Sequence, residues 1–218
     1  MTRLANLGPV EQIRAGRFPR RFAQLMVGLS LFGLGLALII VSGLGAPPWS
    51  VLEVAVAHRA GLSVGSANII ISFLVLAAWV PLRIVPGLGT VLNAIWIGVS
   101  IDASMRFLAA PDPWWAKALM MAVGIVVVGF ASSLYIGAQF GPGPRDGLMT
   151  GLHSRFGWSI ARVRIGLEVA VLAAGWLLGG PVGIGTVAYA AFLGPIIGAT
   201  LAPCIVPLGD LEDSEVTD

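Results

Sequence analysis

The chain has 218 residues, of which 57% are hydrophobic and 11% are charged, and its formal net charge is +2. A soluble domain carries about 25% charged residues, so this composition excludes a soluble globular fold and indicates an integral membrane protein. The basic excess sits in predicted loops rather than in one patch, which argues against a nucleic-acid partner. Cys204 is the single cysteine, so no internal disulfide forms.

The N-terminal segment, residues 1–21, is basic and holds five arginines and one acidic residue, Glu11. The apolar stretch behind it has full spanning length, and no small-residue cleavage pattern closes it, so we do not interpret it as a cleavable signal. We expect this segment to lie in the cytoplasm, where its arginines contact anionic lipid headgroups.

Six apolar stretches follow, and each is predicted to be a membrane-spanning helix because a span needs about 20 apolar residues. The fifth is short, so Arg162 and Arg164 at its start are expected to reach the membrane interface. An acidic tail, residues 205–218, is expected to be disordered. The predicted spans are residues 22–41, 66–85, 88–107, 118–138, 163–178 and 182–204.

Two further segments, residues 45–62 and 141–158, are predicted to be helices too short to cross the membrane. Each holds about 12 helix-compatible residues, or roughly 18 Å, whereas the hydrocarbon core is about 30 Å thick. We interpret both as re-entrant or interfacial helices. An arrangement of eight helices, in which both segments span the membrane, is the alternative.

The two halves of the chain match at an offset of 96 residues, so that residues 28–104 lie over 124–200 without a gap. Gly28 falls on Gly124, Gly45 on Gly141 and Gly98 on Gly194. We therefore predict one membrane domain built of two repeats, residues 22–110 and 118–204. Because each repeat has an odd number of spans, the second repeat is inverted in the membrane relative to the first. Inverted repeats are typical of secondary transporters.

The distribution of basic residues supports this topology, because cytoplasmic loops are rich in Lys and Arg. With both termini in the cytoplasm, ten of the 13 basic residues face that side. Only Arg59, Arg106 and Lys117 face outward. The eight-helix arrangement satisfies the same rule, so it is the length of the short segments that favours six spans.

The sequence Gly-Pro-Gly-Pro-Arg-Asp-Gly at 141–147, with its counterpart at 45–50, predicts a helix that restarts inside the membrane. The N-terminus of such a helix offers free N–H groups to an anion. We therefore predict that Arg145 and Asp146 contact substrate, although Arg145 paired with Asp146 in a cytoplasmic loop is an equal alternative. Trp49 is interpreted as an interfacial anchor. The segment lacks the Lys-Ser/Thr ending of a nucleotide-binding loop.

A second motif occurs at residues 87–98 and again at 183–194, with Gly-x-Gly-Thr-Val at its start. Its small residues predict close helix packing. The threonines Thr90 and Thr186 bond back to the preceding turn or contact substrate. One turn further on, the matched residues Asn93 and Tyr189 are predicted substrate contacts.

Ionisable residues near the spans are Glu53, Asp102, Asp146, His153 and Glu168, and such residues usually face the interior of a helix bundle. Glu168 and Asp102 are our candidates for ion coupling. The structural alternative is an ion pair of Glu168 with Arg164 and of Asp102 with Arg106.

These motifs resemble the YczE/YyaS/YitT family of bacterial integral membrane proteins over about residues 20–204. The resemblance implies a multi-pass protein of the bacterial inner membrane with no agreed substrate. We expect a secondary transporter of a small polar or anionic metabolite, or else a non-transporting assembly or regulatory component. No enzyme motif, metal cluster or cofactor motif is present in the sequence. The expected partners are the lipid bilayer and an unidentified small molecule. The sequence is also compatible with a homo-oligomer.

Overall fold

The structure is a computed structural model that describes residues 8–208, and these form ten helices and no strand. The all-helical fold predicted from the sequence is confirmed. Five helical segments are long and apolar enough to cross a membrane. They are Phe18–Val41 (α2), Val64–Leu82 (α4 and α5), Leu88–Met105 (α6), Trp114–Gly137 (α7) and Ile184–Cys204 (α10).

The helix α9, Ile160–Leu177, has 18 residues but lies outside this set. Its first half carries Arg162, Arg164 and Glu168, so its uninterrupted apolar run is shorter than that of the other long helices. Large apolar side chains such as Val169 and Trp176 nevertheless point outward from it. An apolar outer surface of this kind is suited to lipid rather than water.

Two short helices occupy the segments predicted to be too short to span. They are α3, Pro48–Ala60, and α8, Pro144–Phe156, with 13 residues each. A proline starts each helix, where its missing N–H has no partner to lose. Gly61 and Gly157 end them with φ of 65° and 69°, a left-handed conformation that favours glycine.

The second long segment is broken near its end. The helix α4, Val64–Ala77, stops one residue before α5, Trp79–Leu82. Pro81 accounts for the break, because its ring clashes with the carbonyl four residues earlier, at Ala77. The break turns the indole of Trp79 inward, where its Nε1 donates to the Pro144 carbonyl at 3.0 Å.

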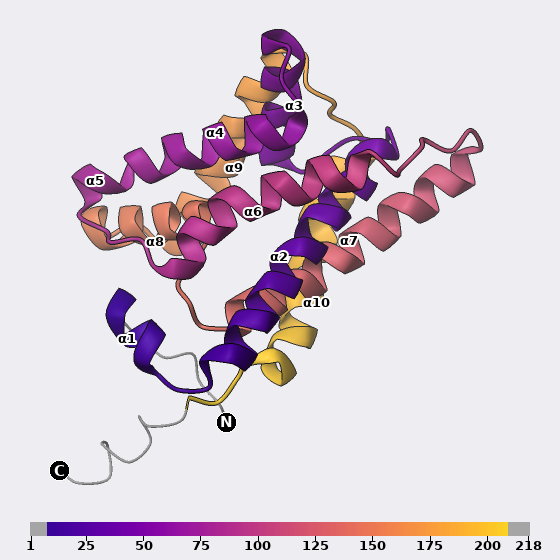
Figure 1. Cartoon of the computed structure of the whole chain (residues 1–218). Helices are drawn as coiled ribbons and strands as arrows, with labels where there is room; N and C mark the ends of the chain where they lie inside the picture. The colour runs from indigo at the N-terminus through magenta and orange to yellow at the C-terminus, as the bar shows by residue number, and fades with distance from the viewer. Residues whose placement is uncertain (1–7, 209–218) are drawn as a thin grey trace, which may run out of the picture.

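The two longest helices, α2 and α7, pack against each other in the middle of the molecule (Figure 1). A Cβ added to Gly28 would lie 2.9 Å from the backbone nitrogen of Tyr135, and one on Gly35 would lie 2.9 Å from the Gly124 carbonyl. As the residue number rises on α2 it falls on α7, so the helices are antiparallel. The absence of side chains at these glycines allows the two backbones to approach closely.

Two helices, α6 and α10, pack directly on this pair, and α3, α4, α5, α8 and α9 lie to one side of it (Figure 1). In the described residues α6 packs on α2, α10 on α7, α4 on α6, and α3 on α9 (Figure 1). The main apolar core is shared by four helices and includes Leu29 and Leu36 of α2, Ile101 of α6, Val128 of α7 and Leu193 of α10.

The chain ends differ from the predicted boundaries. A short helix α1, Pro9–Arg14, lies in the basic segment, and α2 begins at Phe18 rather than at residue 22. Arg21 is buried, and its guanidinium donates to the carbonyls of Ala138 and Gln139 at the end of α7. Positive charge is favourable at a helix C-terminus. Of the predicted acidic tail, residues 209–218 lie outside the described residues.

Candidate functional site

The loops that lead into α3 and α8 are held by the first turns of α10 and α6. The hydroxyl of Thr90 on α6 donates to the Pro142 carbonyl at 2.7 Å, and the Gly89 N–H donates to the Phe140 carbonyl at 2.8 Å. Thr186 on α10 donates in the same way to the Ala46 carbonyl at 2.7 Å. Each short helix therefore starts at a position fixed by the opposite half of the chain.

The start of each short helix borders one cavity of about 300 Å³ in the middle of the molecule. Residues of eight helices, α2 to α4 and α6 to α10, line it. The first N–H groups of a helix have no acceptor within the helix itself. Because α3 and α8 both begin at this cavity, it receives the positive dipole ends of two helices.

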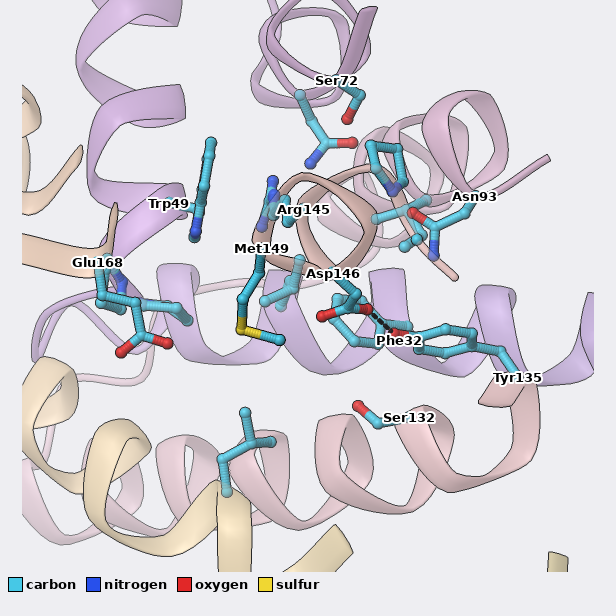
Figure 2. A pocket seen from close by; sticks show the side chains of 18 of the residues that line it. Phe32, Trp49, Ser72, Asn93, Ser132, Tyr135, Arg145, Asp146, Met149 and Glu168 are labelled. Atoms are coloured by element: carbon cyan, nitrogen blue, oxygen red, sulfur yellow. Dashed lines mark hydrogen bonds between the residues drawn. The ribbon is translucent and has the colours of Figure 1, made fainter. Parts of the chain in front are cut away.

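The centre of the site is an ion pair between the two short helices. Nη2 of Arg145 on α8 donates to Oε1 of Glu53 on α3, and Nδ2 of Asn68 on α4 donates to the same oxygen at 2.8 Å. Glu53 is 0% exposed, whereas a quarter of the Arg145 side chain is accessible. The guanidinium carbon of Arg145 lies 4.8 Å from the ring centre of Trp49. Arg145 is thus held by a buried carboxylate and an aromatic face, with one side open to the cavity (Figure 2).

Asp146, the next residue on α8, turns to another wall of the cavity. Its Oδ2 accepts a hydrogen bond of 2.8 Å from the hydroxyl of Tyr135 on α7, which is the dashed contact in Figure 2. The ring of Tyr135 packs edge-on against Phe32 of α2 at 6.0 Å. Asp146 therefore brings a carboxylate that is hydrogen-bonded but forms no ion pair within the described residues.

A second ion pair lies where the cavity approaches the surface. Nε of Arg164 donates to Oε1 of Glu168 at 3.0 Å, one turn later on α9. Both side chains are partly exposed, at 51% and 34%. An exposed pair at this spacing contributes little stability. Both side chains also line the cavity, so both charged groups are accessible from it.

The structure brings most of the predicted site residues together. Arg145, Asp146, Asn93, Tyr189 and Glu168 all line the cavity. The Asn93 amide lies close to the start of α8, since a Cβ on Gly143 would be 3.2 Å from Asn93 Nδ2. Whether these residues contact a substrate stays a prediction.

Three of the predicted residues lie elsewhere. Thr90 and Thr186 are buried and bind the loops described above, and neither lines the cavity. Asp102 accepts hydrogen bonds from the Gly65 N–H at 2.8 Å and from the Ser63 hydroxyl, at the start of α4. Asp102 therefore satisfies free groups at the start of α4, and the alternative ion pair with Arg106 is not formed among the described residues.

Two interpretations of single residues also change. Arg145 pairs with Glu53 rather than with its neighbour Asp146. Trp49 lines the cavity and stacks on Arg145 instead of standing alone as an interfacial anchor. The pair of Arg164 with Glu168, in contrast, is the structural alternative that the sequence offered for Glu168.

Glu53, Asn68 and Tyr135 were missed as site residues. Glu53 was only one of several ionisable residues near the spans, and nothing local in the sequence connects it to Arg145. The signal that could have identified it is an acidic residue within a stretch of a short helix, residues 51–57, that is otherwise apolar.

The fold and the site together define an all-helical membrane protein with an interior cavity that apolar, polar and charged side chains line. A family model described as "Family of unknown function (DUF6198)" matches residues 19–201, and the chain belongs to this family. The resemblance to YczE and YyaS is confirmed as well. No solved structure matches the chain.

The curated relatives are similar over most of their length. An uncharacterized protein of Haemophilus influenzae is 40% identical over 173 residues, which cover 79% of each chain. The uncharacterized membrane protein YczE of Bacillus subtilis is 33% identical over 85% of this chain and 87% of its own. The uncharacterized protein YyaS of the same organism is 28% identical over 73% and 82%.

Proposed function

We propose that this protein is a secondary transporter of a small polar or anionic metabolite, working by alternating access between two inverted repeats. The observation on which the proposal rests is the cavity of about 300 Å³. Two short helices begin at this cavity, and the partly accessible side chain of Arg145 lines it. Broken helices whose N-termini point at a central cavity hold anionic groups in transporters.

The helix boundaries support the two repeats. The first residues of α2, α3, α4 and α6 are 18, 48, 64 and 88, and adding 96 gives 114, 144, 160 and 184, the first residues of α7, α8, α9 and α10. The antiparallel packing of α2 on α7 supports their inversion, because these helices are counterparts at that offset. In this interpretation α9 is the sixth span, and α3 and α8 are re-entrant or interfacial helices that do not cross the membrane.

The cavity lies where the two repeats meet. Matched positions line it from both sides, as expected of a site on the axis that relates inverted repeats. At several of these positions the first repeat is neutral and the second is charged. These pairs are Trp49 and Arg145, Asn68 and Arg164, and Ser72 and Glu168.

The two repeats are packed differently, which fits one state of an alternating cycle. In the first repeat α4 lies directly on α6, where a Cβ on Gly98 would be 2.4 Å from the Gly65 carbonyl. In the second repeat α9 is not packed along α10 within the described residues, and a Cβ on Gly194 would meet no atom within 4 Å. A transporter moves by changing the contacts of one bundle while the other keeps its own.

The test is flux through proteoliposomes that contain the purified full-length protein. A panel of organic anions, amino acids and thiols is offered to wild type, Arg145→Ala and Arg155→Ala, the last being an arginine at the exposed end of the same helix. We expect flux of at least one compound that Arg145→Ala reduces at least tenfold and Arg155→Ala leaves unchanged. No flux of any compound, with unaltered binding by Arg145→Ala, would refute transport.

A specific observation also favours a second function, that of a membrane component that assembles with another helix. Ala190, Gly194, Gly198 and Ala202 are all exposed, four residues apart, on one face of α10. Small residues at this spacing let a second helix approach closely. Recovery of a stoichiometric partner, combined with a lack of flux, would support this assignment.

A further inference from the structure

Arg145 is already occupied in this structure. It donates to the wholly buried carboxylate of Glu53, and such a pair is neutral overall. Adding an anion to a neutral pair would leave one negative charge uncompensated in a region of low dielectric, which is strongly unfavourable. An anion at Arg145 therefore requires that Glu53 lose its negative charge.

Three buried side-chain oxygen atoms in or near this pair have no hydrogen-bond partner among residues 8–208. They are Oε2 of Glu53, Oδ1 of Asn68 and Oγ of Ser50, and all three side chains are buried. Asn68 touches Glu53 through its amide nitrogen, and Ser50 lies one turn before Glu53 on α3. Unpaired oxygens at this depth are unfavourable, and a proton on Oε2 would convert the carboxylate oxygen into a donor.

Few other charges surround Glu53. The helix α4 has no ionisable residue. The neighbouring helix α9 carries Arg162 and the pair of Arg164 with Glu168, and α8 carries Asp146, which is bonded to Tyr135, and, at its far end, His153 and Arg155. On α3 itself, His58 and Arg59 are exposed at the opposite end. Arg145 is thus the charged group that directly contacts the Glu53 carboxylate.

We propose that Glu53 binds the coupling proton, and that protonation of its Oε2 releases Arg145 to the anionic group of the substrate. This inference rests on the proposed transport function and adds its coupling ion. A neutral Glu53, the Arg145 cation and one anion sum to zero charge, as does the original pair alone. Proton and anion therefore enter together, and loss of the proton restores the Glu53 to Arg145 pair and expels the anion.

Trp49 supplies a natural reporter of the release. The guanidinium carbon of Arg145 lies 4.8 Å from the Trp49 ring centre, so movement of Arg145 away from Glu53 changes the surroundings of the indole. The six other tryptophans of the chain are removed from the signal by subtracting the spectrum of Trp49→Phe.

The experiment titrates the purified full-length protein in lipid nanodiscs with protons alone as the probe. Infrared difference spectra follow the protonated-carboxyl band, and fluorescence follows Trp49. We expect one band that titrates together with the Trp49 signal in wild type and in Asp102→Asn, a matched carboxylate outside the cavity. Both changes should be absent in Glu53→Gln.

A second variant keeps the test valid if Glu53→Gln does not fold. In Arg145→Ala the carboxyl band should persist while the Trp49 change is lost, because no guanidinium remains beside the Trp49 ring to move. A band that survives in Glu53→Gln, or a Trp49 change that persists in Arg145→Ala, would overturn the proposal.

Sodium ions are tested as the competing ligand of the same oxygens. At fixed pH, replacing choline chloride by sodium chloride should change neither signal. A sodium-dependent change in wild type that is lost in Glu53→Gln would assign the site to a metal cation and overturn the proton assignment.

The titration also separates the two proposals. It needs no substrate, so a titrating Glu53 in a protein without flux would refute transport while leaving the proton site intact. If flux does not depend on an imposed pH gradient and no protonated-carboxyl band of Glu53 is seen, the proton site is refuted, whereas the transport proposal stands.

Discussion

Thr90 on α6 donates its hydroxyl to the carbonyl of Pro142, 52 residues later, and thereby fixes the loop that starts α8. The same hydroxyl accepts from the Gly87 N–H at 3.2 Å. Thr186 makes the corresponding two contacts, with Ala46 at 2.7 Å and Gly183 at 3.2 Å. One side chain at the start of each helix therefore satisfies its own backbone and the opposite half of the chain.

We predict that Thr90→Val and Thr186→Val each destabilise the protein by about 1–3 kcal/mol, since a carbonyl and an N–H, one buried and one partly buried in each case, lose their partner. The serine variants keep the hydroxyl and serve as controls. Unfolding in mixed detergent micelles measures the difference. If valine and serine variants unfold alike, the hydroxyls do not hold the loops.

The Glu53 and Arg145 pair leads to a prediction about stability that is independent of transport. Arg145→Met leaves the buried Glu53 carboxylate without its cation, a change that typically costs about 3–5 kcal/mol. The double variant Glu53→Met with Arg145→Met removes both charges, and we expect it to recover most of that loss. A double-mutant cycle with Glu53→Met provides the measurement. Strictly additive losses would show that the two side chains are not coupled.

The sequence predicts the short helices well because their signals are local. Proline and glycine at fixed positions start and end α3 and α8 whatever surrounds them. The pair of Arg164 with Glu168 is likewise predictable, because residues four apart share a helix face. The start of α2 was placed four residues late, because Phe18 to Arg21 are helical although two of them are arginines.

The partners of the central charges could not be predicted, because they are distant in sequence. Arg145 and Glu53 are 92 residues apart and come from different halves of the chain. The alternatives that the sequence offered to substrate contact and ion coupling paired Arg145 with its neighbour Asp146 and Asp102 with Arg106, which are the nearest opposite charges. In the structure the first N–H groups of α4 need an acceptor, and Asp102 fills that role.

Alanine substitutions of two glycines, one on α6 and one on α10, are predicted to change the stability in opposite directions. A Cβ on Gly98 would lie 2.4 Å from the Gly65 carbonyl, whereas one on Gly198 would meet no atom within 4 Å. We expect Gly98→Ala to destabilise by about 1–3 kcal/mol through overpacking. Gly198→Ala should stabilise by about 0.5–1 kcal/mol through helix propensity.

Gly198 is the better control than its neighbour Gly194, since Pro195 restricts the backbone of the residue before it. Unfolding of both alanine variants in the same micelles gives the comparison. A loss of stability in Gly198→Ala, accompanied by a change in oligomeric state, would indicate that a second helix packs on this face of α10.

Leu62 and Trp158 test the inverted arrangement itself. They are matched at the 96-residue offset, directly follow the short helices, and are both exposed, at 40% and 56%. In two inverted repeats these positions lie on opposite sides of the membrane. We therefore expect a membrane-impermeant thiol reagent, added to intact cells, to label only Leu62→Cys in a Cys204→Ala background. Trp158→Cys should react only after the cells are opened. Labelling of both positions from the same side would contradict the inverted repeats and favour the eight-helix arrangement, in which each half has an even number of spans.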